Sequence, residues 1–453
     1  MFIKRYIFLL AIALPLFAGV KNLTLNNAIQ VLRNDNLELK ISRFNEQMKA
    51  YEIKAVEGLN YGKLDLTMSG MRSNDAGNVF GFKLQSREAT FGDFGFAEFD
   101  MSGSTNPLPV APQELNYPDA RNHFLTKISY MLPLYTGGKL TEYQNITESM
   151  HRMSQFDTKK LLNAKIFQTK KAFYDISLVN NYISNLSKIT KNIDRLEAIV
   201  RSMQTEGYAQ DIDLLEVQAR RAQAQSMHNQ AKLNKELAYQ FLSFLLNKEV
   251  STIKHVRDMA PMPPVNKSDL EANNIDIQKA LLGLEISDMA VEAKKGNFRP
   301  ELGAFGEYGS ADDVFMNEFF EKDAYTVGVQ MKWNLFNGGV DDANLEKAKV
   351  QRMMVRDQVE LAKKGIALKA KKLKTEVLSA NADIQSYKKQ LKFARKVYEN
   401  YRARYKEGIV SISDVLIQQS KELEMLLKLL TAKNKRNTKI FELDSILNRG
   451  GKV

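Results

Sequence analysis

The residue types that most often carry catalysis or bind metals are sparse in this chain of 453 residues. Cysteine is absent, and no two of the four histidines stand at the spacing of a metal-ligand pair; they are His123, His151, His228 and His255. A chain without cysteine has no thiolate nucleophile, no disulfide and no cysteine-ligated zinc. We therefore predict no metal site and no cysteine chemistry.

Two other patterns resemble chemical motifs only in part. Gly137-Gly-Lys139 looks like the end of a phosphate-binding loop, but Leu140 occupies the position where that loop needs Ser or Thr. The adjacent carboxylates at 312–313 and 341–342 are typical of turns and of helix starts, where acidic side chains are favoured. We predict no catalytic residue and no cofactor, so the protein is not expected to be an enzyme.

The composition is that of a protein built from long helices. Proline accounts for 10 residues, glycine for 24 and charged residues for 26% of the chain, and the mean hydropathy is −0.35. Beyond residue 20 no apolar run reaches the ~18 residues that a membrane helix needs, which excludes a polytopic helical membrane protein. The net charge of +12 comes from lysines spread along helical faces, as in Lys363–Lys374. We predict solvated faces and no nucleic-acid partner; contact of that run with a partner protein or an anionic solute is the alternative.

Residues 1–18 have the layout of a secretory signal peptide. Lys4 and Arg5 precede an apolar stretch at 7–17, and small residues follow at Ala18 and Gly19. We predict that this segment is removed and that the protein is exported by a bacterial cell. An uncleaved membrane anchor is the alternative.

The chain contains two copies of one structural repeat. The pair Gly137-Gly138 recurs as Gly338-Gly339, and Gly207 recurs as Gly408; both recurrences are 201 residues apart. About seventy residues separate these landmarks in each copy without insertion or deletion. Such a constant register indicates a continuous helix, because one extra residue would rotate everything beyond it by ~100°.

Upstream of these landmarks the two copies differ in length. Residues 36–39 match 274–277 at an offset of 238, so the first copy carries 37 extra residues, which we place in a loop insertion around 74–118. We predict four segments after the signal peptide: repeat 1 at 22–250, a linker at 251–268, repeat 2 at 269–447 and a tail at 448–453. Within them we expect preceding helices at about 24–60 and 269–298, and long helical hairpins at 138–247 and 339–447.

Each long helix carries an apolar seam with heptad spacing. In the second copy its members are Val377, Ala380, Ile384, Tyr387, Leu391, Ala394, Tyr398, Tyr401 and Tyr405. Subtracting 201 gives a seam in the first copy that fades toward its end, where Glu197 and Gln204 replace tyrosines. Gly207 and Gly408 are expected to end the long helices, and a capped restart makes each pair a tight hairpin.

Four segments alternate between apolar and polar residues and predict strands at about 62–72, 121–135, 301–310 and 324–336. The last presents a predicted lipid-facing row of Tyr325, Val327, Val329, Met331 and Trp333. A soluble sheet with one face on a core is the alternative. A sheet in lipid must close, and the smallest single-chain barrels have eight strands, so four strands require oligomerisation into eight, twelve or sixteen.

These features together resemble the TolC family of outer-membrane efflux and secretion channels. The stretches that carry the resemblance are Pro133–Gly138, Asn334–Gly339, Tyr405–Leu416 and Asn297–Leu302. The resemblance implies a mostly α-helical fold with a small β part. It also implies a homotrimer in which a twelve-stranded barrel in outer-membrane lipid continues into a periplasmic α-barrel.

The same resemblance implies function and partners. The protein would be a passive exit duct of a tripartite efflux pump or a type I secretion system. It would be opened at its helical tips by a periplasmic adaptor (membrane fusion protein) and an inner-membrane RND, ABC or MFS transporter. The insertion at 79–99 would lie at the outer mouth as a surface loop or a partial plug. The cargo stays open between drugs, metal ions and polypeptides.

The resemblance places a gate near the hairpin tips at Gly207 and Gly408. By motif, Tyr405 and Asp414 correspond to residues that hold the closed entrance in well-known members, although Val410 and Ile417 depart from the family pattern. From the residues themselves, Asp213 and Glu216 share a helix face and with Asp414 are candidates for an acidic ring. Helix capping is the alternative role of the two aspartates. Gly137, Gly138, Gly338 and Gly339 are expected at strand-to-helix junctions.

A second class of function is consistent with the same helices. An exported coiled-coil scaffold or a periplasmic adaptor also contains long helical hairpins, but adaptors usually add a compact β-domain. We expect the outer-membrane channel, with a large periplasmic part.

Overall fold

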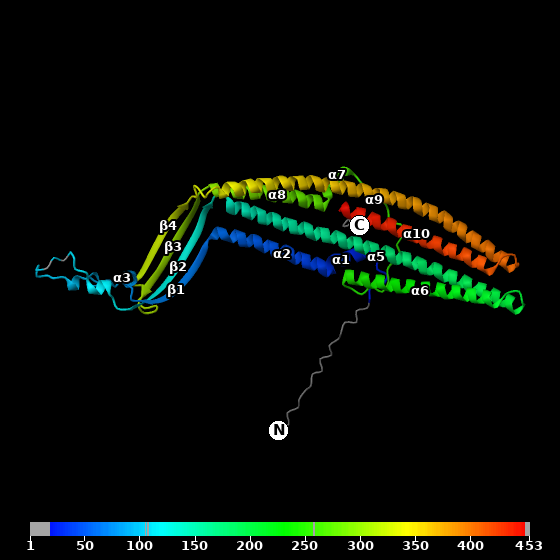
Figure 1. Cartoon of the computed structure of the whole chain (residues 1–453), viewed down its shortest axis with the longest axis horizontal. Helices are drawn as coiled ribbons and strands as arrows, with labels where there is room; N and C mark the ends of the chain where they lie inside the picture. The colour runs from blue at the N-terminus through cyan, green and yellow to red at the C-terminus, as the bar shows by residue number, and fades with distance from the viewer. Residues whose placement is uncertain (1–18, 105, 107, 257–258, 449–453) are drawn as a thin grey trace, which may run out of the picture. The chain divides into compact units, whose positions relative to one another are not determined.

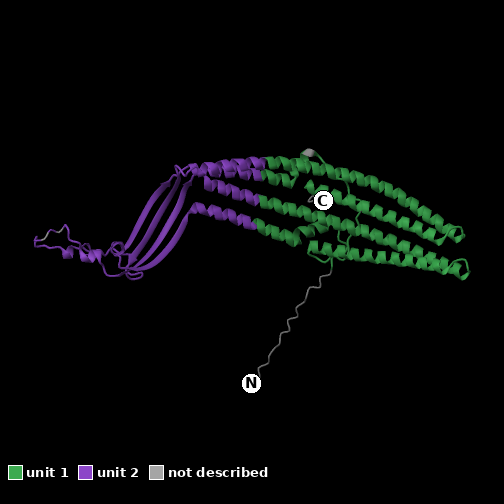
Figure 2. Cartoon of the chain, viewed as in Figure 1, with its two compact units in different colours: residues 1–46, 153–282, 357–453 green, residues 47–152, 283–356 purple. Residues whose placement is uncertain are grey.

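The computed structural model describes residues 19–448 except 105, 107, 257 and 258. The predicted signal peptide and the last five residues of the predicted tail lie outside the described residues. The chain divides into two compact units (Figure 2). Unit 1 comprises the described parts of 1–46, 153–282 and 357–453, and unit 2 comprises 47–152 and 283–356.

Long helices dominate the chain (Figure 1). Those of the first copy are α1 Leu25–Asp35, α2 Leu37–Gly58, α5 Lys139–Thr205 and α6 Asp211–Leu246. Those of the second are α7 Lys267–Asn273, α8 Ile275–Lys295, α9 Val340–Lys406 and α10 Ile412–Ile446. Both α5 and α9 have 67 residues, as the unbroken register between the copies requires.

The helices expected at 24–60 and 269–298 are each interrupted once, which corrects the prediction. The side-chain amide of Asn36 donates to the carbonyl of Leu245 (2.8 Å), and its oxygen accepts from the backbone amide of Leu39 (2.9 Å). Asn274 makes the same two contacts, to Ile446 (2.9 Å) and Ile277 (3.1 Å). Each asparagine therefore caps a new helix and ties it to the end of a returning helix. The duplicated asparagines mark joints, because a buried amide here satisfies backbone groups on two helices.

The predicted seam of the second copy is largely the core of unit 1. Its buried members are Val377, Ala380, Ile384, Leu391, Ala394, Tyr398 and Tyr405. In the first copy the seam does not fade but shifts, which corrects the prediction: the buried row continues as Leu186, Ile189, Ile193, Leu196 and Val200. The steps of three and four residues still describe one helical stripe. Full burial of each such side chain contributes about 1.5–3 kcal/mol.

The sheet belongs to unit 2 and has four antiparallel strands in the order β1-β2-β3-β4. The strands are β1 Lys63–Ser73, β2 Arg121–Thr136, β3 Glu301–Asp312 and β4 Asp323–Lys332. Trp333 therefore lies just past β4 rather than in the predicted lipid-facing row. Its indole nitrogen donates to the carbonyl of Phe298 at 3.1 Å, because the ladder has ended and the chain turns toward the next helix.

The insertion between β1 and β2 is more ordered than the predicted loop. It contains α3 Ala76–Gln85 and the short α4 Gln113–Asn116, with two single turns of 3-10 helix at 92–94 and 96–98. Asp75 caps α3 by accepting from the backbone amide of Asn78 at 3.0 Å. Phe82 of α3 is buried and stacks on His123 of β2, with ring centroids 4.1 Å apart. The insertion is thus anchored on the sheet.

Candidate functional site

The register of the strands separates the sheet into two faces. Directly paired residues of neighbouring strands project to the same face, and Leu66, Ile128 and Tyr308 are aligned in this way, followed by Tyr325. Continuing along the strands, this face collects Leu64, Leu66, Met68, Ile128, Tyr130, Leu132, Leu302, Ala304, Tyr308, Tyr325, Val327, Val329 and Met331. Four members of the predicted lipid-facing row, all but Trp333, therefore lie on one apolar face that extends across the four strands.

The opposite face is largely polar and is hollowed. Asp65, Ser129, Glu307 and Thr326 are aligned across it, and Lys127 pairs with Glu307 at 3.0 Å. A cavity of about 1020 Å³ borders the sheet. Its lining includes Lys63, Asp65, Ser129, Met131, Glu301, Phe305, Glu307, Gln330 and Lys332 of this face, together with Tyr130, Leu132, Leu302 and Ala304. An apolar face opposite a hollow polar one is the arrangement of a membrane strand that lines water.

Both edges of the sheet are open in the described part of the chain. There β1 is hydrogen-bonded only to β2, and β4 only to β3. An open edge leaves backbone amides and carbonyls without partners, which is costly in hydrocarbon.

The glycine pairs stand between strand and helix in both copies, as the sequence predicted. Gly137, Gly138, Gly338 and Gly339 all have φ between +67° and +85°, a region that favours glycine. The backbone also approaches closely at the first pair, because a Cβ on Gly137 would lie 2.5 Å from the carbonyl oxygen of Gly296. These junctions direct α5 and α9 away from the ends of β2 and β4.

The hairpin tips are built identically in the two copies. At the first, the amide of Gly207 donates to Gln204 (3.0 Å) and that of Tyr208 to Met203 (2.7 Å). At the second, Gly408 donates to Tyr405 (2.9 Å) and Ile409 to Arg404 (3.0 Å). This is a Schellman motif, in which a left-handed residue satisfies the last carbonyls of the helix; Gly207 and Gly408 have φ of +79° and +69°.

Asp213 and Asp414 occupy equivalent capping positions in the returning helices. The carboxylate of Asp213 accepts from the backbone amide of Gln210 at 2.9 Å, and that of Asp414 accepts from the amide and hydroxyl of Ser411 at 3.2 and 2.7 Å. Both aspartates thus complete capping boxes. Asp213 and Asp414 therefore act as helix caps, which was the alternative role considered for them. Their place in an acidic ring stays a prediction.

Glu216 and Tyr405 have different surroundings. Glu216 on α6 accepts a hydrogen bond from the hydroxyl of Ser413 on α10 at 2.6 Å, which joins the two hairpins. Tyr405 is buried among apolar residues, including Ile412 and Val415. Burial raises the pKa of Tyr405, and the nearby charge of Asp213 adds to this effect. Glu216 is therefore an exposed contact between hairpins, whereas Tyr405 is part of the core that holds them.

A set of apolar residues at the hairpin tips was not predicted from the sequence. They are exposed in the described structure: Tyr208, Ile212 and Leu215 on the first hairpin, with Ile409 and Ile417 on the second. Only Tyr208 and Ile409, which directly follow the helix-ending glycines, had a signal in the sequence. Spacing alone does not separate the other exposed residues from Val410 and Ile412, which enter the core. Ile417, which departs from the family pattern, belongs to this surface, whereas Val410 packs against the core.

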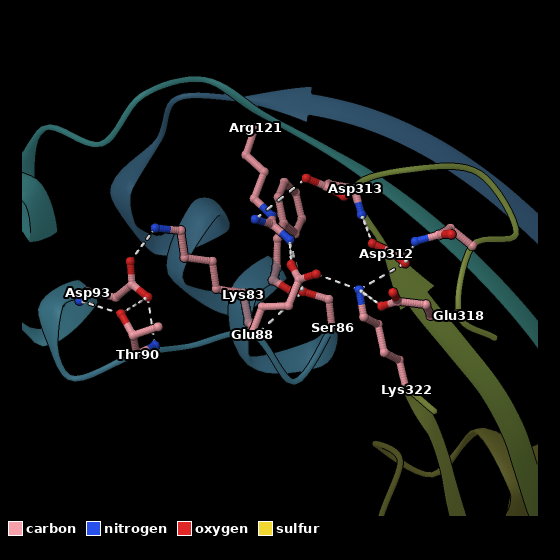
Figure 3. A network of polar contacts seen from close by, with 12 residues as sticks. Lys83, Ser86, Glu88, Thr90, Asp93, Arg121, Asp312, Asp313, Glu318 and Lys322 are labelled. Atoms are coloured by element: carbon pink, nitrogen blue, oxygen red, sulfur yellow. Dashed lines mark hydrogen bonds and ion pairs between the residues drawn. The ribbon is translucent and has the colours of Figure 1, made fainter. Parts of the chain in front are cut away.

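One acidic group outside the sheet hollow has the geometry of metal ligands. Oxygens of Glu88, Asp312 and Asp313 lie within 4.8 Å of one another. However, Lys322 pairs with Glu88 and with Asp312 (2.9 Å), and Arg121 pairs with Glu88 (Figure 3). The two cations offset most of the charge of the three carboxylates, so we interpret the group as a structural ion-pair network. Among the described helices, none is long and apolar enough to cross a membrane.

Comparisons with known proteins agree with this geometry. Residues 267–449 match the family model described as Outer membrane efflux protein. The fold is similar to that of CusC (15% identity, TM-score 0.76, covering 95% of this chain and 92% of that one). It is also similar to the Campylobacter jejuni CmeC outer membrane channel (16%, 0.70, 94% and 86%) and the Neisseria gonorrhoeae MtrE outer membrane channel (14%, 0.73, 94% and 88%). A comparison with curated protein sequences gave no match.

Fold and matches together define an outer-membrane channel of the TolC type, mostly helical with a four-stranded antiparallel sheet. Residues 267–449 match the outer membrane efflux protein family, and the fold of the chain is that of TolC-type channels, in agreement with the resemblance. It is an efflux channel of tripartite systems and not an enzyme, located in the outer membrane with a periplasmic helical domain. The fold and the family match therefore favour the channel hypothesis over the scaffold or adaptor hypothesis.

Proposed function

We propose that three copies of this chain form the exit duct, with their sheets closed into one twelve-stranded barrel. The observation that carries this proposal is the sheet itself, which has an apolar face, a hollow polar face and two open edges. The β1 edge of one copy pairs with the β4 edge of the next, so that no backbone group faces lipid unpaired. The polar faces then enclose a water-filled lumen.

Exposed helical stripes support the same assembly. On α2 the stripe consists of Leu37, Ile41, Phe44, Met48 and Tyr51, each more than half exposed, and on α9 it consists of Val350, Met354, Leu361 and Leu368. The α2 residues are spaced by four and three positions, and the α9 residues by four and seven positions, as in a coiled-coil seam. In the described part of the single chain both stripes remain exposed. We propose that neighbouring copies cover these stripes.

The helical tips are the proposed periplasmic entrance. The exposed apolar residues of both tips, with Tyr208 and Ile409 beside the turns, provide a docking surface for an adaptor. The Glu216–Ser413 hydrogen bond joins the hairpins at this level and must break if they separate. An inner-membrane RND, ABC or MFS transporter supplies the driving force, and the duct itself is passive.

Cross-linking and conductance test this proposal. The chain lacks cysteine, so Ile41→Cys combined with Leu361→Cys reports contact between the α2 and α9 stripes of different copies. We expect an oxidised, SDS-resistant trimer in the outer-membrane fraction and ion conductance in planar bilayers. As the matched control, Cys replaces Lys40 and Glu360, which lie beside the stripes. A water-soluble monomer without conductance would contradict the proposal.

A further inference from the structure

The insertion between β1 and β2 carries an unusual amount of exposed apolar surface. Phe91 is 81% exposed, Met101 89% and Leu108 89%, and Phe96 and Tyr117 are also largely exposed. The β3–β4 connection in the second copy has only the ten residues 313–322. That connection also exposes apolar side chains, such as Phe320 at 82%, but the longer insertion of the first copy is not required to connect two strands.

The exposed residues surround a groove within the same segment. The groove has a volume of about 320 Å³, and its apolar lining comes from Phe94, Phe96, Phe99, Val110 and Pro112. A space of this size accommodates one or two apolar side chains. The groove and the exposed apolar side chains thus occur on one segment. The groove of one copy could therefore receive exposed side chains from another copy.

The base of the insertion is fixed to the outer ends of the strands. Lys322, which is 9% exposed, pairs with Glu88 of the insertion, with Asp312 at the end of β3 and with Glu318 (3.0 Å), while Arg121 at the start of β2 pairs with Glu88 (Figure 3). Burial opposes the charge of Glu88, but hydrogen bonds from Lys322 and Arg121 hold its pKa below the ordinary value. The segment is therefore ordered before it meets a partner, which lowers the entropic cost of association.

The charge of the segment identifies the kind of partner. Residues 74–118 contain two basic and six acidic side chains, although the whole chain has a net charge of +12. Anionic membrane surfaces attract clusters of Lys and Arg and repel acidic segments. The acidic charge therefore argues against an anionic membrane surface as the partner, and contact between two copies of the segment must be made by its apolar residues.

We propose that the insertions of the three copies pack against one another in a ring that narrows the outer mouth of the duct. The groove of each copy receives apolar side chains from the insertion of the next. Such a head-to-tail contact closes on itself under threefold symmetry. This inference rests on the proposed trimer, because the ion-pair network holds each insertion at the strand ends that the trimer brings together.

Photo-cross-linking tests contact between insertions in the full-length protein in its membrane. p-Benzoyl-phenylalanine replaces Phe91 in one variant and Phe44, on the proposed α2 interface, in another. We expect both probes to link two copies, with the Phe91 probe linked to a peptide within 74–118. Links between copies from Phe44 but not from Phe91 would overturn the ring and leave the trimer intact. If neither probe links copies, the trimer itself is contradicted.

A pair of double variants tests the consequence for conduction. Phe91→Ser with Phe96→Ser removes the apolar contact, whereas Phe91→Leu with Phe96→Leu keeps it. We expect a higher single-channel conductance in planar bilayers and loss of the ring cross-link, probed at Met101, for the serine pair only. An SDS-resistant trimer in both variants shows that each has folded. Equal conductance and equal cross-linking in the two pairs would contradict the proposal.

Discussion

The two helical hairpins have the same turns but different stems. Both tips end in a Schellman glycine followed by a capping box. Along the stems, fourteen residues of α10 are buried but only six of α6. The comparison shows that duplication preserved the turn, which depends on local backbone geometry, while the packing of the two returning helices diverged.

The difference extends to the forces that hold each hairpin. In hairpin 1, Glu197 accepts from Arg201 at 2.9 Å and pairs with Arg221 of α6 at 3.6 Å. In hairpin 2 the position equivalent to Glu197 is Tyr398, which is buried in the apolar core. Hairpin 2 keeps one counterpart with reversed charges, because Arg395 and Glu422 pair at 3.0 Å where hairpin 1 has Asp194 and Arg221. Partly exposed ion pairs contribute less than buried apolar contacts and are screened by salt. Hairpin 1 is therefore expected to separate more easily near its tip.

The largest effect is expected from truncating the seam. Ile384→Ala in hairpin 2 removes a side chain that is 1% exposed and should destabilise the protein by about 2–5 kcal/mol. The equivalent Ile183→Ala in hairpin 1 affects a half-buried residue and should cost roughly half as much. Thermal unfolding in detergent measures both variants. Equal losses would contradict the difference between the stems.

Substitution of the two tip glycines should lower stability equally, which tests the conclusion that the two hairpins have the same turn. Gly207→Ala and Gly408→Ala each force a residue with Cβ into a left-handed conformation, at a cost of about 1–2 kcal/mol. Neither position has an atom that would clash with a Cβ, so the cost is conformational in both. Urea unfolding should give the same loss for the two variants, and a clear difference would show that the tips are not equivalent.

Features set by local pattern could be predicted from the sequence, and features set by distant partners could not. The glycine turns follow from residue types at fixed spacing. The shift of the α5 seam to Ile189 and Leu196 could not be predicted, because it depends on which helices surround α5. The joints at Asn36 and Asn274 were also missed, since an asparagine within an apolar pattern reveals no distant carbonyl.

The candidate site was predictable to a similar extent. Alternation identified Tyr325, Val327, Val329 and Met331, since period two is a property of the strand alone. It also included Trp333, which lies one residue past the end of β4, because alternation does not show where hydrogen bonding ends. The ion pair of Lys322 with Glu88 joins residues 234 positions apart and left no signal in the sequence.

A smaller effect is expected from salt. At 1 M salt the screening length falls to about 3 Å, which weakens the Arg221 pairs with Asp194 and Glu197. Hydrogen exchange at 190–225 in hairpin 1, where Arg221 pairs with two carboxylates, should accelerate more than at 391–426 in hairpin 2, where Arg395 pairs with Glu422 at 3.0 Å. Glu197→Gln should reduce the added salt response without removing it, because the Arg221–Asp194 pair at 2.7 Å remains, and the stability change should stay below about 1 kcal/mol. The comparison fails if hairpin 2 responds as strongly.

The smallest effect on stability is expected at the capping aspartates, where charge and capping can be separated. In Asp213→Asn and Asp414→Asn the side-chain oxygen still accepts from the N-cap amide, so the cap is retained while the negative charge is lost. We expect a stability change below about 1 kcal/mol in each and weaker block of the channel by a trivalent lanthanide cation in planar bilayers. Asp211→Asn, on the same helix but outside the capping pair, is the matched control. If block is unchanged in both variants, these aspartates act only as caps, and the acidic ring is excluded at this level of the hairpins.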